Sequence, residues 1–368
     1  MIPLCAPNLR FKRFSREIGD AIRRVFEGGQ IILGPEVERF EQSFSAYVGS
    51  RHCIGVNSGT DALILSLRAL GLQPGDEVIT VSMSFSATAM AILHAGGVPR
   101  FVDVDPETRC MDLAQLEGLV GPRTVAILPV HLHGRPVDMP RLMTIADRHG
   151  LAVVEDCAQA HGARIGERAA GSFGRLAAFS FYPTKNLGCP GDGGAIVTSD
   201  PALAARVRAL RTYGWSDDRR VSTELGHNSR LDELHAAVLN VLLPHLDEGN
   251  RERSDIAAVY RRILEHGPAR LPSPHPGAVY HQFAVCVPRR QLLRDVLRKR
   301  SGIETGVHYP VPLHRHPLFA AYARAPLPIT DELAQSLVSL PIQPEVARDQ
   351  AQYIAESVME EMVECAAS

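Results

Sequence analysis

The stretch HCIGVNSGTDALILSLRAL, residues 52–70, decides the fold. It opens with a short apolar run that is typical of a buried strand, turns at Ser58-Gly59-Thr60, and continues as an amphipathic helix. Further apolar runs occupy residues 74–83, 98–105, 124–134, 151–157, 176–182 and 193–200. Because the early runs alternate with helical patterns of about ten residues, they predict βαβ units, an α/β fold and a mostly parallel central sheet flanked by helices.

The rest of the chain predicts two domains. Helices are expected at 15–28 and at 35–48, where Pro35 occupies a first-turn position. After residue 200 the pattern is mainly helical, and from about residue 270 it mixes helices with short strands. We expect an N-terminal arm and large domain over 1–245, and a smaller C-terminal α+β domain over 246–368.

Composition excludes several classes of function. The chain has 368 residues and a formal net charge of −2, so nothing in the totals indicates a partner such as nucleic acid or an anionic membrane. Its seven cysteines form no C-x-x-C pair, which favours reduced thiols and a cytoplasmic location. No run of 18 apolar residues and no signal-peptide pattern appears, so we expect neither secretion nor a membrane span.

Four features are expected at the carboxyl edge of the sheet, where open α/β folds bind ligands. Gly59 and Thr60 begin a helix whose N-terminus would suit a phosphate, although a purely structural turn would have the same sequence pattern. Asp156 follows a continuous apolar run, yet it could be only a helix N-cap. Phe85 follows a strand and alone would be assigned to the core.

The fourth feature is Lys185, in FSFYPTKNLGCPGDGGA (179–195), with Ser180 five residues before it. A lone lysine is normally solvated. Together, however, the four features describe a flat pyridine ring with a phosphate, an aldehyde and a ring nitrogen, which is pyridoxal phosphate (PLP). Lys185 would form the Schiff base, and partial desolvation would leave some of its amine uncharged and nucleophilic.

The order and spacing of several blocks resemble the sugar aminotransferases of the DegT/DnrJ/EryC1/StrS family, which are fold-type I PLP enzymes. The resemblance runs from about residue 30 to residue 317. The blocks that carry it are VNSGTDAL, PGDEVIT, ATAMAILHAG, FVDVDPET, PVHLHGRPVDM, VVEDCAQAHGA, FSFYPTKNLG…GDGGAIVTSD, LRTYGW, GHNSRLDELHAAVL and GIETGVHYPVPLHRHP.

The resemblance implies a role for each matching position. Lys185 would bind the cofactor and later move the proton, and Asp156 would pair with the pyridine nitrogen. Phe85 would stack on the ring and Gln159 would contact its 3-oxygen. The phosphate would be held by Gly59, Thr60 and Ser180, and by Asn228 of the neighbouring subunit, which implies a homodimer with shared active sites.

The resemblance also implies the reaction. L-Glutamate would deliver the amine and leave as 2-oxoglutarate, and a nucleotide-linked keto-sugar would accept it. Gln159 and His161 resemble members that act at C3, which favours a dTDP-3-keto-6-deoxyhexose. The side chains expected to contact this substrate are His161, Tyr182, His308 and Tyr309.

Alternatives remain open at this stage. One is an aminotransferase that acts at C4 of a nucleotide keto-sugar, or on an amino-cyclitol ketone, and a remoter one is a PLP-binding regulator without catalysis. Lys185 argues against a dehydratase, and the lack of G-x-G-x-x-G after the first strand argues against a Rossmann dehydrogenase. Cys189-Pro190 departs from the family pattern, and because proline fixes φ and lacks an N–H donor, we expect the loop after the lysine to differ from that of other members. The H-x-H pairs lack zinc-ligand spacing, and we expect no metal.

Overall fold

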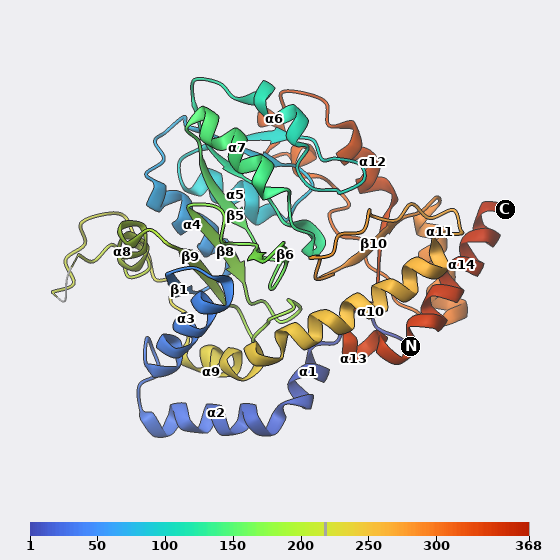
Figure 1. Ribbon diagram of the computed structural model, residues 1–368, viewed down its shortest axis with the longest axis horizontal. Helices are drawn as coiled ribbons and strands as arrows, with labels where there is room; N and C mark the ends of the chain where they lie inside the picture. The colour runs from blue at the N-terminus through green and yellow to red at the C-terminus, as the bar shows by residue number, and fades with distance from the viewer. Residues whose placement is uncertain (217–218, 368) are drawn as a thin grey trace.

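A seven-stranded sheet forms the centre of the structure, a computed structural model that describes residues 1–216 and 219–367 (Figure 1). Its order is β1-β9-β8-β5-β4-β2-β3. The strands are β1 His52–Val56, β2 Glu77–Val81, β3 Val98–Val102, β4 Thr124–Leu128, β5 Ala152–Asp156, β8 Leu176–Ser180 and β9 Gly194–Thr198. Only β9 runs antiparallel to its neighbours, β1 and β8, so the prediction of a mostly parallel sheet is confirmed.

Both faces of the sheet are buried, as the apolar runs require. In β8, Ala177 and Phe179 belong to one hydrophobic cluster, whereas Leu176 and Ala178 belong to the cluster on the opposite face. This alternation follows from the two-residue period of a strand, which sends successive side chains to opposite faces. Continuous apolar runs are therefore expected in a sheet that is covered on both sides.

Helices cover the two faces of the sheet. One face packs against α3 (Pro35–Val48), α7 (Met139–His149) and α9 (Glu233–Leu242), and α2 (Ser15–Gly28) lies against α9. The other face packs against α4 (Gly59–Leu70), α5 (Ser86–His94) and α8 (Pro201–Leu210). Helices α2 and α3 have the predicted bounds.

A second core lies toward the C-terminus, around α10 (Leu246–Leu264). The antiparallel pair β10 (Phe283–Cys286) and β11 (Leu337–Leu340) packs against it. The remaining helices here are α11 Arg290–Val296, α12 Pro328–Ser336, α13 Pro344–Ala347 and α14 Ala351–Ala367. This agrees with an α+β region, while the domain boundary at 245/246 stays a prediction.

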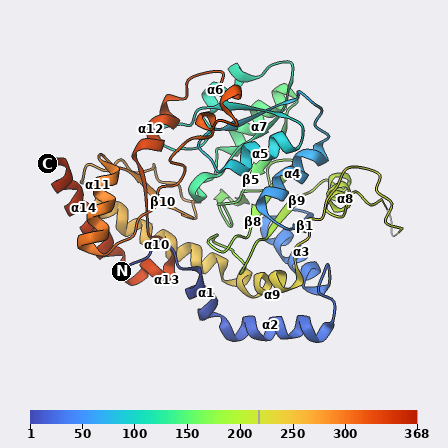
Figure 2. The ribbon, with the colours of Figure 1, turned by 180° about the vertical axis from the view of Figure 1, so that it is seen from behind.

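Several short elements differ from the sequence expectations. The sequence pattern predicts one helix over 289–301, whereas the structure has α11 followed by a π-helical turn over 297–301. The pattern also predicts a single final helix from residue 345, whereas the structure divides it into α13 and α14. Helices α1 (Pro7–Arg13) and α6 (Leu113–Leu119) and the hairpin β6–β7 (Arg164–Ile165 and Arg168–Ala169) had not been expected. Seen from behind, α1 lies beside α10 and α13 (Figure 2). Among the described residues, no helix combines the length and apolar character needed to cross a membrane.

Candidate active site

A cavity of about 520 Å³ opens at the carboxyl edge of the sheet. It gathers side chains from the ends of β2, β5 and β8 and from the loop after residue 303. Of the residues that the sequence singles out, those lining it are Gly59, Thr60, Phe85, Asp156, Gln159, Ser180, Tyr182, Lys185, His308 and Tyr309. Segments separated by up to 250 positions in the chain therefore meet around one space.

One end of the cavity is the first turn of α4. Ser58 caps this helix by accepting a hydrogen bond from Asp61 N at 3.1 Å. The N–H groups of a first helical turn lack partners inside the helix, and with the helix dipole they favour an anion. A Cβ on Gly59 would lie 2.5 Å from Ser180 Cβ, so only glycine lets β8 approach this turn so closely. The result is a cradle suited to a phosphate.

Asp156, the last residue of β5, is the acid of the site. Its Oδ2 accepts from Thr88 Oγ1 at 3.0 Å, and its Oδ1 accepts from Ala158 N at 3.1 Å. Burial raises the pKa of Asp156, while these hydrogen bonds and the nearby Lys185 amine oppose the shift. A buried carboxylate held in this way can pair with a cationic N–H in the cavity.

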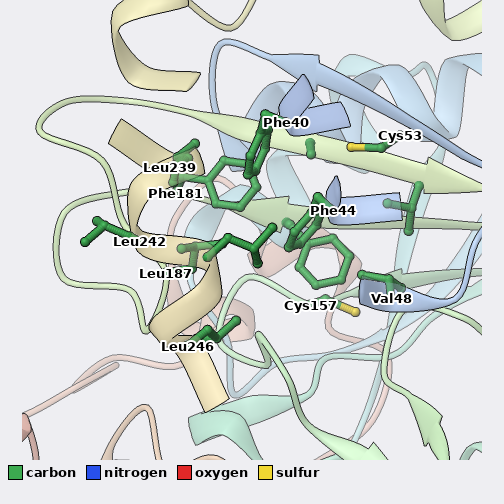
Figure 3. Packing of buried hydrophobic residues seen from close by; sticks show 14 of the residues in the cluster. Phe40, Phe44, Val48, Cys53, Cys157, Phe181, Leu187, Leu239, Leu242 and Leu246 are labelled. Atoms are coloured by element: carbon green, nitrogen blue, oxygen red, sulfur yellow. The ribbon is translucent and has the colours of Figure 1, made fainter. Parts of the chain in front are cut away.

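Lys185 lies in a turn that is anchored on both sides. Phe181 and Leu187 flank it and are both buried in the cluster shown in Figure 3. Its backbone N–H donates to Tyr182 O at 2.9 Å. Burial lowers the pKa of Lys185 to about 8, although the Asp156 carboxylate opposes the shift. A larger fraction of its amine is therefore neutral near pH 7 than for an ordinary lysine, as a nucleophile requires.

Phe85 and Gln159 form two further parts of the wall. Phe85 lies beside the cavity with 62% of its surface exposed, so assignment to the core is wrong for this residue. Gln159 Oε1 accepts from His133 N at 2.6 Å, and its Nε2 donates to Tyr309 Oη at 2.6 Å. One amide hydrogen of Gln159 remains available for a ligand.

Two predicted site residues lie away from the cavity. His161 is fully buried, with its ring 5.5 Å from that of Phe179 and 5.7 Å from that of Phe181. Its position gives no support to the expected substrate contact, because the turn after Asp156 directs it into the core. Asn228 is exposed and does not line the cavity of its own chain. Its expected contact with a neighbouring subunit stays a prediction.

Sequence reasoning missed two residues that support the site. Arg10, on α1, is only 7% exposed, and its Nη1 donates to Lys185 O at 2.8 Å and to Asn186 O at 3.0 Å. Thr88 donates to Asp156 from the first turn of α5. The spacing of Thr88 from Phe85 could have indicated its place, whereas nothing local in the sequence connects Arg10 with a lysine 175 positions away.

The residues present fit PLP. The cradle at Gly59 suits its phosphate, Asp156 suits its ring nitrogen, Phe85 offers an aromatic face, and the Lys185 amine suits its aldehyde. The cavity volume falls within the usual range for small-molecule sites, which is about 300–1,000 Å³.

Behind Asp156, three possible metal ligands lie close together: His131, Glu155 and Cys157. Glu155 accepts hydrogen bonds from the N–H groups of residues 171, 173 and 174 and pairs with His131 Nε2 at 3.0 Å. His131 Nδ1 accepts from Val137 N at 3.0 Å. Both ring nitrogens and both carboxylate oxygens are engaged, so this network fixes the loops around β5 and is not arranged as a metal site.

Comparison with known proteins agrees with this geometry. A model of the DegT/DnrJ/EryC1/StrS aminotransferase family matches residues 13–359. The chain is 46% identical to a dTDP-3-amino-3,4,6-trideoxy-alpha-D-glucose transaminase of Streptomyces venezuelae, over 98% of this chain and 96% of the relative. It is 41% identical to a UDP-N-acetyl-3-dehydro-alpha-D-glucosamine 3-aminotransferase of Acidithiobacillus ferrooxidans, over 96% of each. The crystal structure of S. venezuelae DesV in complex with a ketimine intermediate superposes with a TM-score of 0.93, at 46% identity and 98% coverage of both chains.

Proposed function

The chain belongs to the DegT/DnrJ/EryC1/StrS aminotransferase family, and from that premise we propose that it aminates the C3 ketone of a dTDP-linked 6-deoxyhexose. It is an aminotransferase of the nucleotide-sugar type, and its cofactor is PLP. L-Glutamate gives up its amino group and leaves as 2-oxoglutarate, and the keto-sugar becomes an amino-sugar. The names of the two relatives support C3 as the position and leave both dTDP and UDP as nucleotides to test.

The observation that carries this proposal is the meeting of Lys185 and Asp156 in one cavity. When bound there, PLP supplies an aldehyde that takes up the amine and a ring that withdraws electrons from the neighbouring carbon. Asp156 keeps the proton on the ring nitrogen by presenting a buried carboxylate. The Lys185 amine, whose pKa is lowered to about 8 by burial, is the group that removes and returns the proton at the reacting carbon.

The remaining residues bind and orient. The first turn of α4, with Gly59, Thr60 and Ser180, holds the phosphate, and Phe85 covers one face of the ring. Tyr182, His308 and Tyr309 lie on the wall where the sugar or the amino acid would contact the protein. Asn228 would complete the phosphate site of a second copy, so the active form is a homodimer, and we place it in the cytoplasm.

The lysine content of the chain makes a sharp first test possible. There are only three lysines, at 12, 185 and 299. Borohydride reduction of the PLP-loaded protein should attach the cofactor to the peptide containing Lys185 and to neither of the others. Lys185→Ala should abolish both this label and turnover, while Lys299→Ala, at an exposed position, should change neither.

Substrate specificity needs a panel. The loaded enzyme, given L-glutamate, would be incubated with 3-keto and 4-keto sugars carrying dTDP or UDP and with a cyclitol ketone, and product masses would be measured. Amination of the dTDP-linked 3-keto sugar is the expected result. Amination of the cyclitol alone would overturn the sugar assignment, and a loaded protein that aminates nothing would favour the regulator.

A further inference from the structure

A second, smaller cavity of about 150 Å³ adjoins the active-site cavity. The two share a wall formed by Thr184, His281, Gln282 and His308. Its other walls come from the N-terminal segment at Leu4 and Cys5, from Arg253 on α10, and from the end of β11 and the residues just after it (Ser339, Leu340, Ile342 and Gln343). The Lys185 charge acts on both His281 and His308, so the shared wall lies near the reacting amine.

We infer that this cavity binds a carboxylate group of the amino donor, and that Arg253 is the residue that recognises it. The inference rests on the proposed function, because it takes an amino acid as the first substrate. It adds the place where that amino acid is held and the side chain that distinguishes it from the sugar.

The hydrogen bonding of Arg253 is the first argument. Its side chain is buried, with 4% exposed, and Nη1 donates to Tyr280 O at 3.2 Å. In the part of the chain that the structure describes, this is its one hydrogen bond, and no carboxylate oxygen lies within 4.0 Å of the guanidinium. A guanidinium has five N–H donors, and a buried charge without a partner is strongly destabilising. An anion entering the cavity would compensate this charge.

Gln343, His308 and Ser339 on the wall are already paired, and Arg253 is the one arginine or lysine among the residues that line this cavity. Gln343 Oε1 accepts from Ala6 N at 2.8 Å, and its Nε2 donates to Ala6 O and to Glu345. The Glu345 carboxylate, which influences Arg253 electrostatically, accepts this hydrogen bond from Gln343 at 2.9 Å. His308 Nδ1 pairs with Ser339 Oγ at 2.8 Å.

The charge around the cavity also favours an anion. Arg10 lies close enough to Arg253 to contribute, with burial, to lowering the pKa of Arg253 to about 10, which leaves the guanidinium charged at pH 7. Burial and the Lys185 charge lower the pKa of His308 to about 4, so this ring is a neutral hydrogen-bonding group. The guanidinium fork matches a carboxylate in shape and in charge.

The test separates the two half-reactions. Arg253→Gln removes the charge, Arg253→Lys keeps it, and Arg251→Gln removes an exposed charge from the same helix as a matched control. For Arg253→Gln, the KM for L-glutamate in the donor half-reaction should rise at least about 30-fold, as expected when one partner of a buried charge pair is lost. Arg253→Lys should recover part of this loss, and Arg251→Gln should behave as wild type.

The acceptor half-reaction distinguishes donor binding from a purely structural role of Arg253, because a structural defect would slow this half-reaction as well. Protein loaded with pyridoxamine phosphate should aminate the keto-sugar at an unchanged rate in Arg253→Gln, because the proposed sugar has no carboxylate. An equal loss in both half-reactions would mean that Arg253 only maintains the fold, and would overturn the inference. Unchanged glutamate kinetics would overturn it as well.

Ligand binding to the wild-type holoenzyme keeps the inference testable if Arg253→Gln does not fold. Glutarate, which has the carboxylates of glutamate without the amine, should raise the melting temperature and compete with L-glutamate; no effect would count against the site. Comparison with L-glutamine, which has an amide in place of the side-chain carboxylate, identifies the carboxylate that Arg253 binds. If Arg253→Lys weakens the binding of both amino acids, Arg253 binds the α-carboxylate. If it weakens the binding of L-glutamate alone, Arg253 binds the side-chain carboxylate. A wild-type enzyme that ignores L-glutamate yet is converted by other amino acids would instead refute the donor named in the proposed function.

Discussion

Replacement of Arg10 by methionine would test how the catalytic lysine is held. Arg10 Nη1 bonds two backbone carbonyls, those of Lys185 and Asn186, at 2.8 and 3.0 Å. Each hydrogen bond from a charged donor contributes about 1.5–3 kcal/mol. Loss of both therefore destabilises the native arrangement of this turn by about 3–6 kcal/mol. About 1–2 kcal/mol of this is recovered, because the variant no longer buries a guanidinium beside Arg253.

We expect this loss to appear mainly in the position of Lys185. The kcat of the donor half-reaction in Arg10→Met should fall about 30- to 100-fold, which corresponds to about 2–3 kcal/mol. Borohydride labelling at Lys185 should slow as well, while the melting temperature drops only a few degrees. Lys12→Ala changes an exposed residue of the same helix and is the control. If Arg10→Met keeps kcat and labelling within about threefold of wild type, the carbonyl contacts do not position the lysine.

Three further predictions concern the same cavity. The first is the pH dependence of PLP capture, measured by adding PLP to the cofactor-free protein at a series of pH values and trapping the product with borohydride. The trapped fraction should rise with pH with a midpoint at about 8, because burial lowers the pKa of Lys185 to about 8 and the neutral amine is the reacting form. A midpoint near 10.5 would show an ordinary, solvated lysine. Asp156→Asn should reduce kcat at least about 100-fold, because the ring nitrogen loses its charged partner. It should also move the midpoint of PLP capture below that of wild type, because the Asp156 carboxylate raises the pKa of Lys185. An unshifted midpoint with a normal rate would contradict the pairing. Gly59→Ala should weaken PLP binding at least about tenfold by dialysis, because the new Cβ would meet Ser180 at 2.5 Å, whereas Gly19→Ala, with nothing within 4 Å, should bind as wild type.

The sequence predicts most of the sheet and the convergence of its catalytic residues. Apolar runs and helical periods are local features, so the strands at 52–56 and 152–156 follow from them directly. The sequence also predicted that Lys185 and Asp156 lie close together, because the carboxyl ends of parallel strands share one edge of a sheet. Together with Gly59-Thr60 and Phe85 they predicted PLP as the cofactor, and the comparisons confirm it.

Longer-range packing could not be predicted in the same way. The contact of Arg10 with Lys185 depends on how the N-terminal segment crosses the finished fold, and no pattern in a seven-residue helix encodes that path. The family resemblance led us to expect His161 at the substrate, but the turn after Asp156 places its ring close to those of Phe179 and Phe181. The antiparallel direction of β9 was open to prediction, since the Gly-rich link after Ser180 contains no crossover helix.

The path of the N-terminal segment has a practical consequence for anyone producing the protein. Ile2 pairs with the chain at Gly302 and Glu304, and eight residues later Arg10 reaches the carbonyl of Lys185, so the first ten residues tie the far end of the fold to its reactive centre. Met1 itself is 77% exposed. An affinity tag can therefore be added ahead of Met1, whereas trimming this segment to aid crystallisation would lower the activity of the enzyme without removing any ligand-binding side chain of the main cavity.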